Sequence, residues 1–217
     1  SETSLERPRN ILRRSDLEHG EIRGGTLVDF EEVADLDDLP TPDFSDLPVD
    51  RYLSPHVTYP LAGSRGCYWR KCSFCAISVS SCSIFRARSV RLLRDDMTKL
   101  IRENGARFFF FNDNGVPPQH LAAIADCARS SGEHIAWTGM VRQEKAFTLE
   151  MLEGLKAGGC LQLLIGQESS NERVIALMRK GIDLGTAETT LRSAARAGIA
   201  VSLMNIIGFP TESEEAA

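Results

Sequence analysis

Hydrophobic and polar positions follow two different periods along the chain after residue 56. Short apolar runs with the length of buried strands, such as ARFFFFND at residues 106–113, alternate with segments in which apolar residues recur every three or four positions. The segment 91–105 has this second period and ends in a glycine, which is a typical helix stop. The pattern therefore predicts strands that alternate with helices.

Five units of this kind follow one another along the chain. We expect strands over residues 56–63, 106–113, 134–142, 160–166 and 199–209, and helices over residues 91–105, 117–132, 149–159, 171–181 and 186–198. Thr148 is the expected N-cap of the third helix, and Ser169 with Glu172 has the spacing of a capping box before the fourth. Because strands separated by helices pair in parallel through right-handed crossovers, the predicted fold class is α/β. About five βα units would form a parallel sheet or part of a barrel.

Residues 1–56 lack this alternation. The segment 31–50 contains eight acidic residues, no basic one and three prolines. This composition is typical of an extended arm or a linker between domains, although apolar residues such as Phe44 could dock it onto a neighbouring surface. We therefore predict an extended acidic N-terminal arm over residues 1–56 and one core over residues 57–217.

Charge and hydropathy exclude two classes of partner. A net charge of −5 and a pI near 5.5 argue against non-specific binding to nucleic acid or to an anionic membrane surface. No apolar run approaches the ~20 residues that a membrane span needs, and the N-terminal segment SETSLERPRN has no signal-peptide core. We expect a cytoplasmic protein with no membrane or nucleic-acid partner.

Three of the six cysteines lie within nine residues, in the sequence CYWRKCSFC that begins at Cys67. In a reducing compartment such a cluster holds a metal or carries redox chemistry more often than it forms disulfides. Cys127 lies on the apolar face of a predicted helix and Cys160 opens a predicted strand, so both are expected in the core. For Cys82 we favour a structural role and leave open a role as fourth ligand or reactive thiol.

The spacing of Cys67, Cys72 and Cys75 allows three thiolates to bind one metal centre from a single loop. A structural zinc site needs a fourth protein ligand, for which His56 and Cys82 are candidates. An iron-sulfur cluster held by three thiolates would instead leave one iron open to a cofactor or substrate. Both alternatives remain at this point.

Polar residues also follow the other predicted strands. In a parallel sheet, ligands bind at the carboxyl ends of the strands, because the loops there converge. Such residues are Asn112 and Asp113 after the second strand, Arg142 after the third, and Glu168 and Ser169 after the fourth.

The cysteine motif, placed directly after the first strand, resembles the cluster loop of the radical S-adenosylmethionine (radical SAM) superfamily. Four residues separate Cys67 from Cys72, where three are usual, and this spacing is similar to that of the cobalamin-binding branch, whose loops read RGCYWxxCxFC. The segments FFFFNDNG, IGQESSNERVIALMRKG and MNIIGFPTES resemble further parts of the same family. The resemblance covers most of residues 36–217 and implies a partial (β/α) barrel of the TIM type.

The resemblance implies a radical SAM enzyme. Its cofactors would be a [4Fe-4S] cluster on Cys67, Cys72 and Cys75 and S-adenosylmethionine, cleaved reductively to a 5′-deoxyadenosyl radical that takes hydrogen from an unknown substrate. An electron donor of the flavodoxin or ferredoxin type would be the partner, and radical methylation is one reaction of this branch. This chain contains no D-x-H-x-x-G segment, so cobalamin would bind through a domain outside it. No catalytic residue is assigned, because the cofactors carry the chemistry.

The resemblance also implies a set of contacts to S-adenosylmethionine. These residues are Phe74, Asn112, Asp113, Arg142, Glu168, Ser169, Ile206 and Gly208. Five of them have an alternative: Asp113 as part of a turn, Glu168 and Ser169 as helix caps, Arg142 as the ion-pair partner of Glu144 or Glu150, and Phe74 as a core residue. Lys180 is predicted to be a solvated helix end.

Two other classes of function stay open in the sequence. One is a zinc-stabilised α/β binding module, and the other is an iron-sulfur scaffold without catalysis. Because a sheet that ends at the fifth strand would leave an uncovered edge, we expect either a fragment of a longer polypeptide or a partner that completes the barrel.

Overall fold

The computed structural model describes residues 22–23, 26–27, 33–79 and 84–214 of the chain, so Cys82 lies outside the described residues. The chain divides into two units, Ser1–Ala34 and Asp35–Ala217. In the first unit, β1 (Ile22–Arg23) and β2 (Thr26–Leu27) form an antiparallel pair. All other described elements belong to the second unit.

The second unit is built on one parallel sheet. Its strands are β3 (Thr58–Leu61), β6 (Phe108–Phe111), β7 (Ala136–Val141), β8 (Cys160–Glu168) and β9 (Ala200–Asn205), and they lie side by side in that order. Each neighbouring pair is parallel. The predicted α/β class and the five predicted strands are thus confirmed. A strand order that follows the sequence is the arrangement of a (β/α) barrel, here present as an open part of one.

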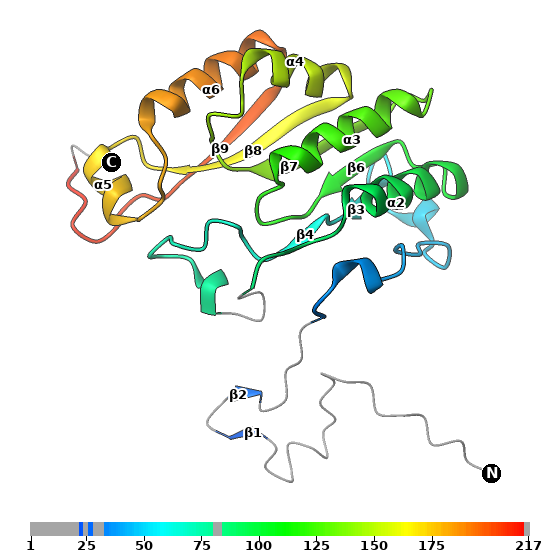
Figure 1. Cartoon of the computed structure of the whole chain (residues 1–217), viewed down its shortest axis with the longest axis horizontal. Coiled ribbons are helices and arrows are strands. Elements are labelled where there is room, and N and C mark those ends of the chain that lie inside the picture. The colour runs from blue at the N-terminus through cyan, green and yellow to red at the C-terminus, as the bar shows by residue number, and fades with distance from the viewer. Residues whose placement is uncertain (1–21, 24–25, 28–32, 80–83, 215–217) are drawn as a thin grey trace. The chain divides into compact units, whose positions relative to one another are not determined.

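The helices that connect these strands cover one face of the sheet (Figure 1). They are α2 (Val90–Glu103), α3 (Pro118–Ser130), α4 (Leu149–Ala157) and α6 (Leu184–Arg196), with the shorter α5 (Glu172–Leu177) before α6. The hydroxyl of Thr148 accepts a hydrogen bond from the Met151 amide, which confirms Thr148 as N-cap of α4. No helix in the described part of the chain is both long and apolar enough to span a membrane.

The predicted start and end of α5 were wrong. Asn171, and not Ser169, is the N-cap, because its side chain accepts hydrogen bonds from the amides of Arg173 and Val174. The helix already ends at Leu177, so the chain leaves helical geometry before Lys180 and Gly181. These two residues belong to an irregular segment that becomes part of the site described below.

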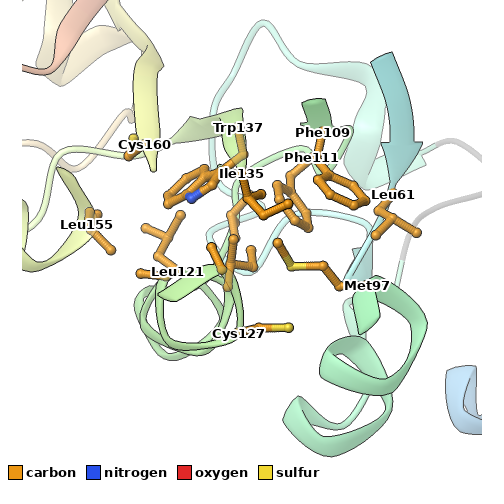
Figure 2. Close-up of a cluster of buried hydrophobic side chains, with 14 of the residues drawn as sticks. Leu61, Met97, Phe109, Phe111, Leu121, Cys127, Ile135, Trp137, Leu155 and Cys160 are labelled. Carbon is orange, nitrogen blue, oxygen red and sulfur yellow. The ribbon is translucent and has the colours of Figure 1, made fainter. Parts of the chain in front are cut away.

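The core lies between the sheet and its helices. Phe109, Phe111 and Trp137 point from β6 and β7 toward α2 and α3, and Cys127 and Cys160 lie in the same cluster (Figure 2). The two cysteines are buried, as predicted, and burial raises the pKa of the Cys160 thiol to about 12. The Trp137 indole donates a hydrogen bond of 2.7 Å to the Gly158 carbonyl, which satisfies its polar atom inside the core.

Residues 35–48 pack against the strands and α2. Phe44 meets Tyr59 edge to face at 5.4 Å, and Leu36 is buried at the start of the short helix η1 (Leu36–Asp38). A second short helix, η2 (Val49–Arg51), leads to β3. The docking expected of Phe44 is confirmed, and residues 35–56 lie in the same compact unit as the sheet. The boundary between residues 56 and 57 stays a prediction.

A buried ion pair fixes this segment. The guanidinium of Arg88 lies 2.6 Å from the Asp96 carboxylate and donates further hydrogen bonds to the carbonyls of Leu36 and Leu39. The Thr41 hydroxyl donates to Asp96 over 2.6 Å. A polar network therefore joins residues 36–41 to α2 and to the strand beside the cysteine loop.

Candidate cofactor site at the cysteine loop

The cysteine loop leaves the sheet through a small hairpin. β4 (Ser64–Arg65) pairs in antiparallel with β5 (Arg86–Ala87), and the loop lies between them. Asp113, at the end of β6, accepts hydrogen bonds from the Gly63 amide over 3.1 Å and from the Ser64 hydroxyl. Asp113 is buried, and burial raises the pKa of its carboxyl group despite these hydrogen bonds. Asp113 thus fastens the base of the loop to the carboxyl end of the sheet.

The three cysteines of the loop are reduced and half-buried. Burial raises the pKa of the Cys72 thiol, while the nearby cations of Lys180 and Arg142 act in the opposite direction. Within the described residues no three His, Cys, Asp or Glu side chains already converge as a metal site.

Three hydrogen bonds attach the loop to the end of α5. The Ser73 amide donates to the Met178 carbonyl (2.9 Å), the Ser73 hydroxyl to the Leu177 carbonyl (3.0 Å), and the Trp69 indole to the Arg179 carbonyl (2.9 Å). The last carbonyls of a helix have no partner within the helix. The cysteine loop supplies these partners, so residues 177–181, here called the loop seat, hold the loop in place.

Lys180 is buried, so the prediction of a solvated helix end was wrong. Its ammonium group lies 2.8 Å from the Glu168 carboxylate and 5.9 Å from the centre of the Phe74 ring. Glu168 has a positive φ of 72° at an irregular register between β8 and β9, which turns it out of the regular ladder. Because α5 ends early, Lys180 turns back toward the strand ends, where its positive charge compensates the negative charge of the Glu168 carboxylate.

Arg142 also contacts the loop seat. It donates to the Lys180 carbonyl over 2.9 Å, stacks on the Trp69 ring at 4.6 Å and approaches the Glu144 carboxylate to 3.8 Å. The ion pair with Glu144 that the sequence suggested is thus present. Phe74, in contrast, is 38% exposed and is not a core residue.

A chain of amides crosses the ends of β7 and β8. Gln143 donates to the Gln167 side chain over 3.1 Å, and Gln167 donates to the Ser170 hydroxyl over 2.9 Å. Both glutamines are buried, and the Gln143 amide oxygen has no partner in the described part of the chain. Sequence reasoning missed Gln143, because only its position next to Arg142 at a strand end pointed to it.

A cavity of about 1120 Å³ adjoins the loop. Its walls include Cys72, Phe74 and Cys75 from the loop and Ile175, Gly181 and Ile182 from the opposite side. Two of the candidate metal ligands therefore open onto a space large enough for a cofactor.

The remaining candidate residues are less closely joined to the loop. The Asn112 side chain is exposed, and Ser169 accepts a hydrogen bond from the Asn171 amide. The Ile206 amide donates to the Glu168 carbonyl over 2.8 Å, which ties β9 to the site. Gly208 has a positive φ of 82° and donates to the Glu212 carboxylate over 2.6 Å. These contacts bring Ile206 to the site edge and leave Gly208 in the turn beyond it.

His56 lies at the opposite end of the sheet. It precedes β3 and stacks on the Phe108 ring at 4.5 Å, whereas the cysteine loop follows the carboxyl end of the same strand. His56 is therefore not placed to complete a metal site with the three cysteines.

Comparison with known proteins identifies the fold that carries this site. The family model of the radical SAM superfamily matches residues 62–217. The chain belongs to this superfamily. Membership in the radical SAM superfamily implies a [4Fe-4S] cluster and S-adenosylmethionine as cofactors.

Two curated relatives of this radical SAM chain are methyltransferases by name. An uncharacterised methyltransferase of Pyrococcus horikoshii is 28% identical over 210 residues, which are 95% of this chain and 45% of the relative. The bacteriochlorophyllide d C-12(1)-methyltransferase of Chlorobaculum tepidum is 26% identical over 172 residues, 75% of this chain and 37% of the relative. The chain thus spans less than half the length of the curated relatives that it matches.

A solved structure shows the same fold. TsrM from Kitasatospora setae, a radical S-adenosylmethionine methyltransferase with cobalamin and a [4Fe-4S] cluster bound, superposes with a TM-score of 0.62 at 18% identity. The match covers 73% of this chain and 32% of TsrM. The partial radical SAM barrel predicted from the sequence is confirmed by this likeness.

Proposed function

We propose that the chain forms the cofactor-binding core of a radical SAM enzyme, in which Cys67, Cys72 and Cys75 hold a [4Fe-4S] cluster and S-adenosylmethionine binds beside it. One observation carries the proposal: three half-buried cysteines lie on a loop whose base is fastened to the carboxyl end of β6 by the buried Asp113 and whose middle is hydrogen-bonded to the loop seat. An ordinary surface loop would not need anchors at both its base and its middle.

The donor set fits the cluster better than it fits zinc. Structural zinc is closed by four protein ligands, whereas an iron-sulfur cluster on three thiolates keeps one iron open for a cofactor. His56, one of the two candidates for a fourth zinc ligand, lies at the other end of β3. The cavity beside Cys72 and Cys75 offers the open position the space that a second cofactor needs.

The cofactors, when bound, supply a reductive cleavage that yields a 5′-deoxyadenosyl radical. The protein's own residues bind and orient them. Burial raises the pKa of the Cys72 thiol, and the cations of Lys180 and Arg142 offset part of this rise. The exposed ring of Phe74 offers an apolar wall for an adenine base. Glu168, beside Lys180, can accept hydrogen bonds from a ribose or an ammonium group. The contacts proposed for Asn112, Asp113, Ser169, Ile206 and Gly208 follow from the family resemblance.

The reaction of the whole protein belongs to the same proposal. The methyltransferase names of the two relatives, and the cobalamin bound to TsrM, support transfer of a methyl group to a substrate that is still unknown. A flavodoxin or ferredoxin would supply the electron. Exposed Arg70 and Lys71 on the cysteine loop suit an acidic donor of this kind.

Anaerobic reconstitution tests the proposal. The purified chain is loaded with iron and sulfide, reduced with dithionite and given S-adenosylmethionine, and chromatography detects 5′-deoxyadenosine. We expect a brown protein whose electron paramagnetic resonance signal changes when S-adenosylmethionine is added, together with formation of 5′-deoxyadenosine.

The two rival functions predict different results. A zinc-stabilised module would be colourless and contain one zinc ion per chain, as measured by elemental analysis. A scaffold without catalysis would take up the cluster, but its resonance signal would not respond to S-adenosylmethionine. Either result would refute the enzymatic role.

A further inference from the structure

Gly181 packs directly against the Trp69 ring of the cysteine loop. The indole ring lies so close to Gly181 that a Cβ atom there would be 1.9 Å from Cζ2 and 2.2 Å from Cη2 of the ring. No real Cβ approaches another atom so closely. Gly181 also has a φ of +66°, a backbone conformation that favours glycine. Glycine is therefore required at position 181 for two independent reasons: its positive φ and the lack of space for a Cβ beside the Trp69 ring.

The Trp69 ring is held by polar groups as well. The Arg142 guanidinium lies 4.6 Å and the Lys71 ammonium 4.8 Å from the ring, and the indole N–H donates to the Arg179 carbonyl over 2.9 Å. Cations over an aromatic face are attracted by its electron density. Arg142 in turn donates to the Lys180 carbonyl, so both the ring and its cation are attached to the loop seat.

We propose that Trp69 is a positioning residue, which clamps the cysteine loop onto residues 177–181 and thereby sets where Cys72 and Cys75 stand relative to the Glu168–Lys180 pair. This inference rests on the proposed function, since it concerns the placement of the cluster ligands. Trp69 acts through the loop and is not assigned a contact with a cofactor.

The clamp explains the four residues between Cys67 and Cys72. Trp69 extends to the loop seat, and Arg70 then turns the chain back with a positive φ of 54° before Cys72. Ser73 follows with its two hydrogen bonds to the carbonyls of Leu177 and Met178. One fewer residue would shorten the path between the clamp and the second cysteine.

Substitution of Gly181 tests the clamp in the chain as purified. We expect Gly181→Ala to push the ring away, to shift the fluorescence of Trp69 and to speed hydrogen exchange of the Ser73 amide by roughly tenfold or more. Trp137, the other tryptophan, is buried in the core and gives a constant background. Mass spectrometry of peptides that span residues 69–76 measures the exchange.

Two other glycines are matched controls. Gly105 and Gly132 have φ angles of +64° and +71°, but nothing lies within 4 Å of a Cβ built there. Gly105→Ala and Gly132→Ala therefore impose the same backbone strain without a clash, and we expect them to leave exchange of the loop unchanged. If they speed it as much as Gly181→Ala does, strain alone explains the effect and the clamp is refuted.

A double substitution isolates the contact. With Trp69→Ala already present, Gly181→Ala has no ring to displace, so its additional effect on loop exchange should fall to that of the control glycines. An equal effect in both backgrounds would contradict the proposal.

The placement of the cluster ligands is tested after reconstitution. We expect Trp69→Ala to retain iron through its three cysteines and to give a weakened change in the resonance signal on addition of S-adenosylmethionine, which Trp69→Phe restores in part. A Trp69→Ala protein with wild-type exchange and a wild-type signal would overturn the inference. If the wild-type chain binds no cluster, the proposed function fails, while the exchange measurements still decide whether the clamp exists.

Discussion

The helix-covered core and the cysteine loop are held together by different forces. In the core, Phe109, Phe111 and Trp137 interlock with apolar side chains of α2 and α3, and many small contacts share the stabilisation. The loop depends on a few directed contacts: Asp113 at its base, Ser73 in its middle and Trp69 on Gly181.

This difference determines how each region responds to change. A core spreads the loss of one side chain over many neighbours, although the cavity left behind is costly. A loop held by single hydrogen bonds and one ring loses its geometry at once when a contact is removed. Function therefore depends on residues that contribute little to the stability of the whole chain.

The cysteines give the largest contrast between the two regions. We expect Cys67→Ala, Cys72→Ala and Cys75→Ala each to abolish cluster loading, because each would leave only two of the usual thiolate ligands. Cys127→Ala and Cys160→Ala should keep the brown colour, since both thiols lie in the core. Iron and sulfide analysis after reconstitution measures the effect. A retained cluster in any variant of the first group would refute that ligand.

Two phenylalanine substitutions, one in the core and one in the cysteine loop, should differ in their effect on the free energy of unfolding. Phe109 is 1% exposed, so we expect Phe109→Ala to lower the free energy of unfolding by roughly 3–5 kcal/mol. Phe74 is 38% exposed, and Phe74→Ala should cost less than about 1 kcal/mol while it weakens binding of S-adenosylmethionine. Urea unfolding and titration with the cofactor measure the two effects. Equal losses of stability would contradict the assignment of Phe74 to the site.

The buried Arg88–Asp96 ion pair, which holds residues 36–41, should have an intermediate effect on stability. Asp96→Asn weakens its contacts with Arg88 and Thr41, and we expect a loss of about 2–3 kcal/mol and faster hydrogen exchange in residues 36–41. Asp95→Asn is the matched control, because the Arg91–Asp95 pair is exposed and should contribute less than about 1 kcal/mol. Similar losses for both variants would show that burial of the pair does not matter.

Glu168→Gln should lower stability less than Asp96→Asn does and should have a clear effect on the site. It leaves the buried Lys180 without a carboxylate, at an expected cost of about 1–2 kcal/mol. We also expect weaker cofactor binding, since Lys180 lies over the Phe74 ring. Glu188→Gln, in an exposed pair with Arg192, is the control and should change neither property. If Glu168→Gln binds the cofactor with wild-type affinity, Glu168 does not contribute to the cofactor site.

The strands and helices could be predicted from the sequence because they depend on residues close together in the chain. Five apolar runs predicted the five strands, and Thr148 marked the start of α4 through a hydrogen bond with the amide three residues further along. The early end of α5 was not readable in the same way. The carbonyls of Leu177 and of Arg179 just beyond the helix accept hydrogen bonds from Ser73 and Trp69, about a hundred residues away in the chain. No local pattern of the sequence contains these contacts.

The order of residues along the chain was enough to predict the α/β class, to place the cysteine loop after the first strand and to show the resemblance to the radical SAM superfamily. These features depend on spacing and periodicity along one chain. Three contacts became visible only in the folded protein: Lys180 is buried against Glu168, Asp113 fastens the loop, and Gly181 packs against Trp69. Each of these contacts joins residues from different elements, whose distance is set by the packing of the sheet and its helices rather than by their order in the sequence.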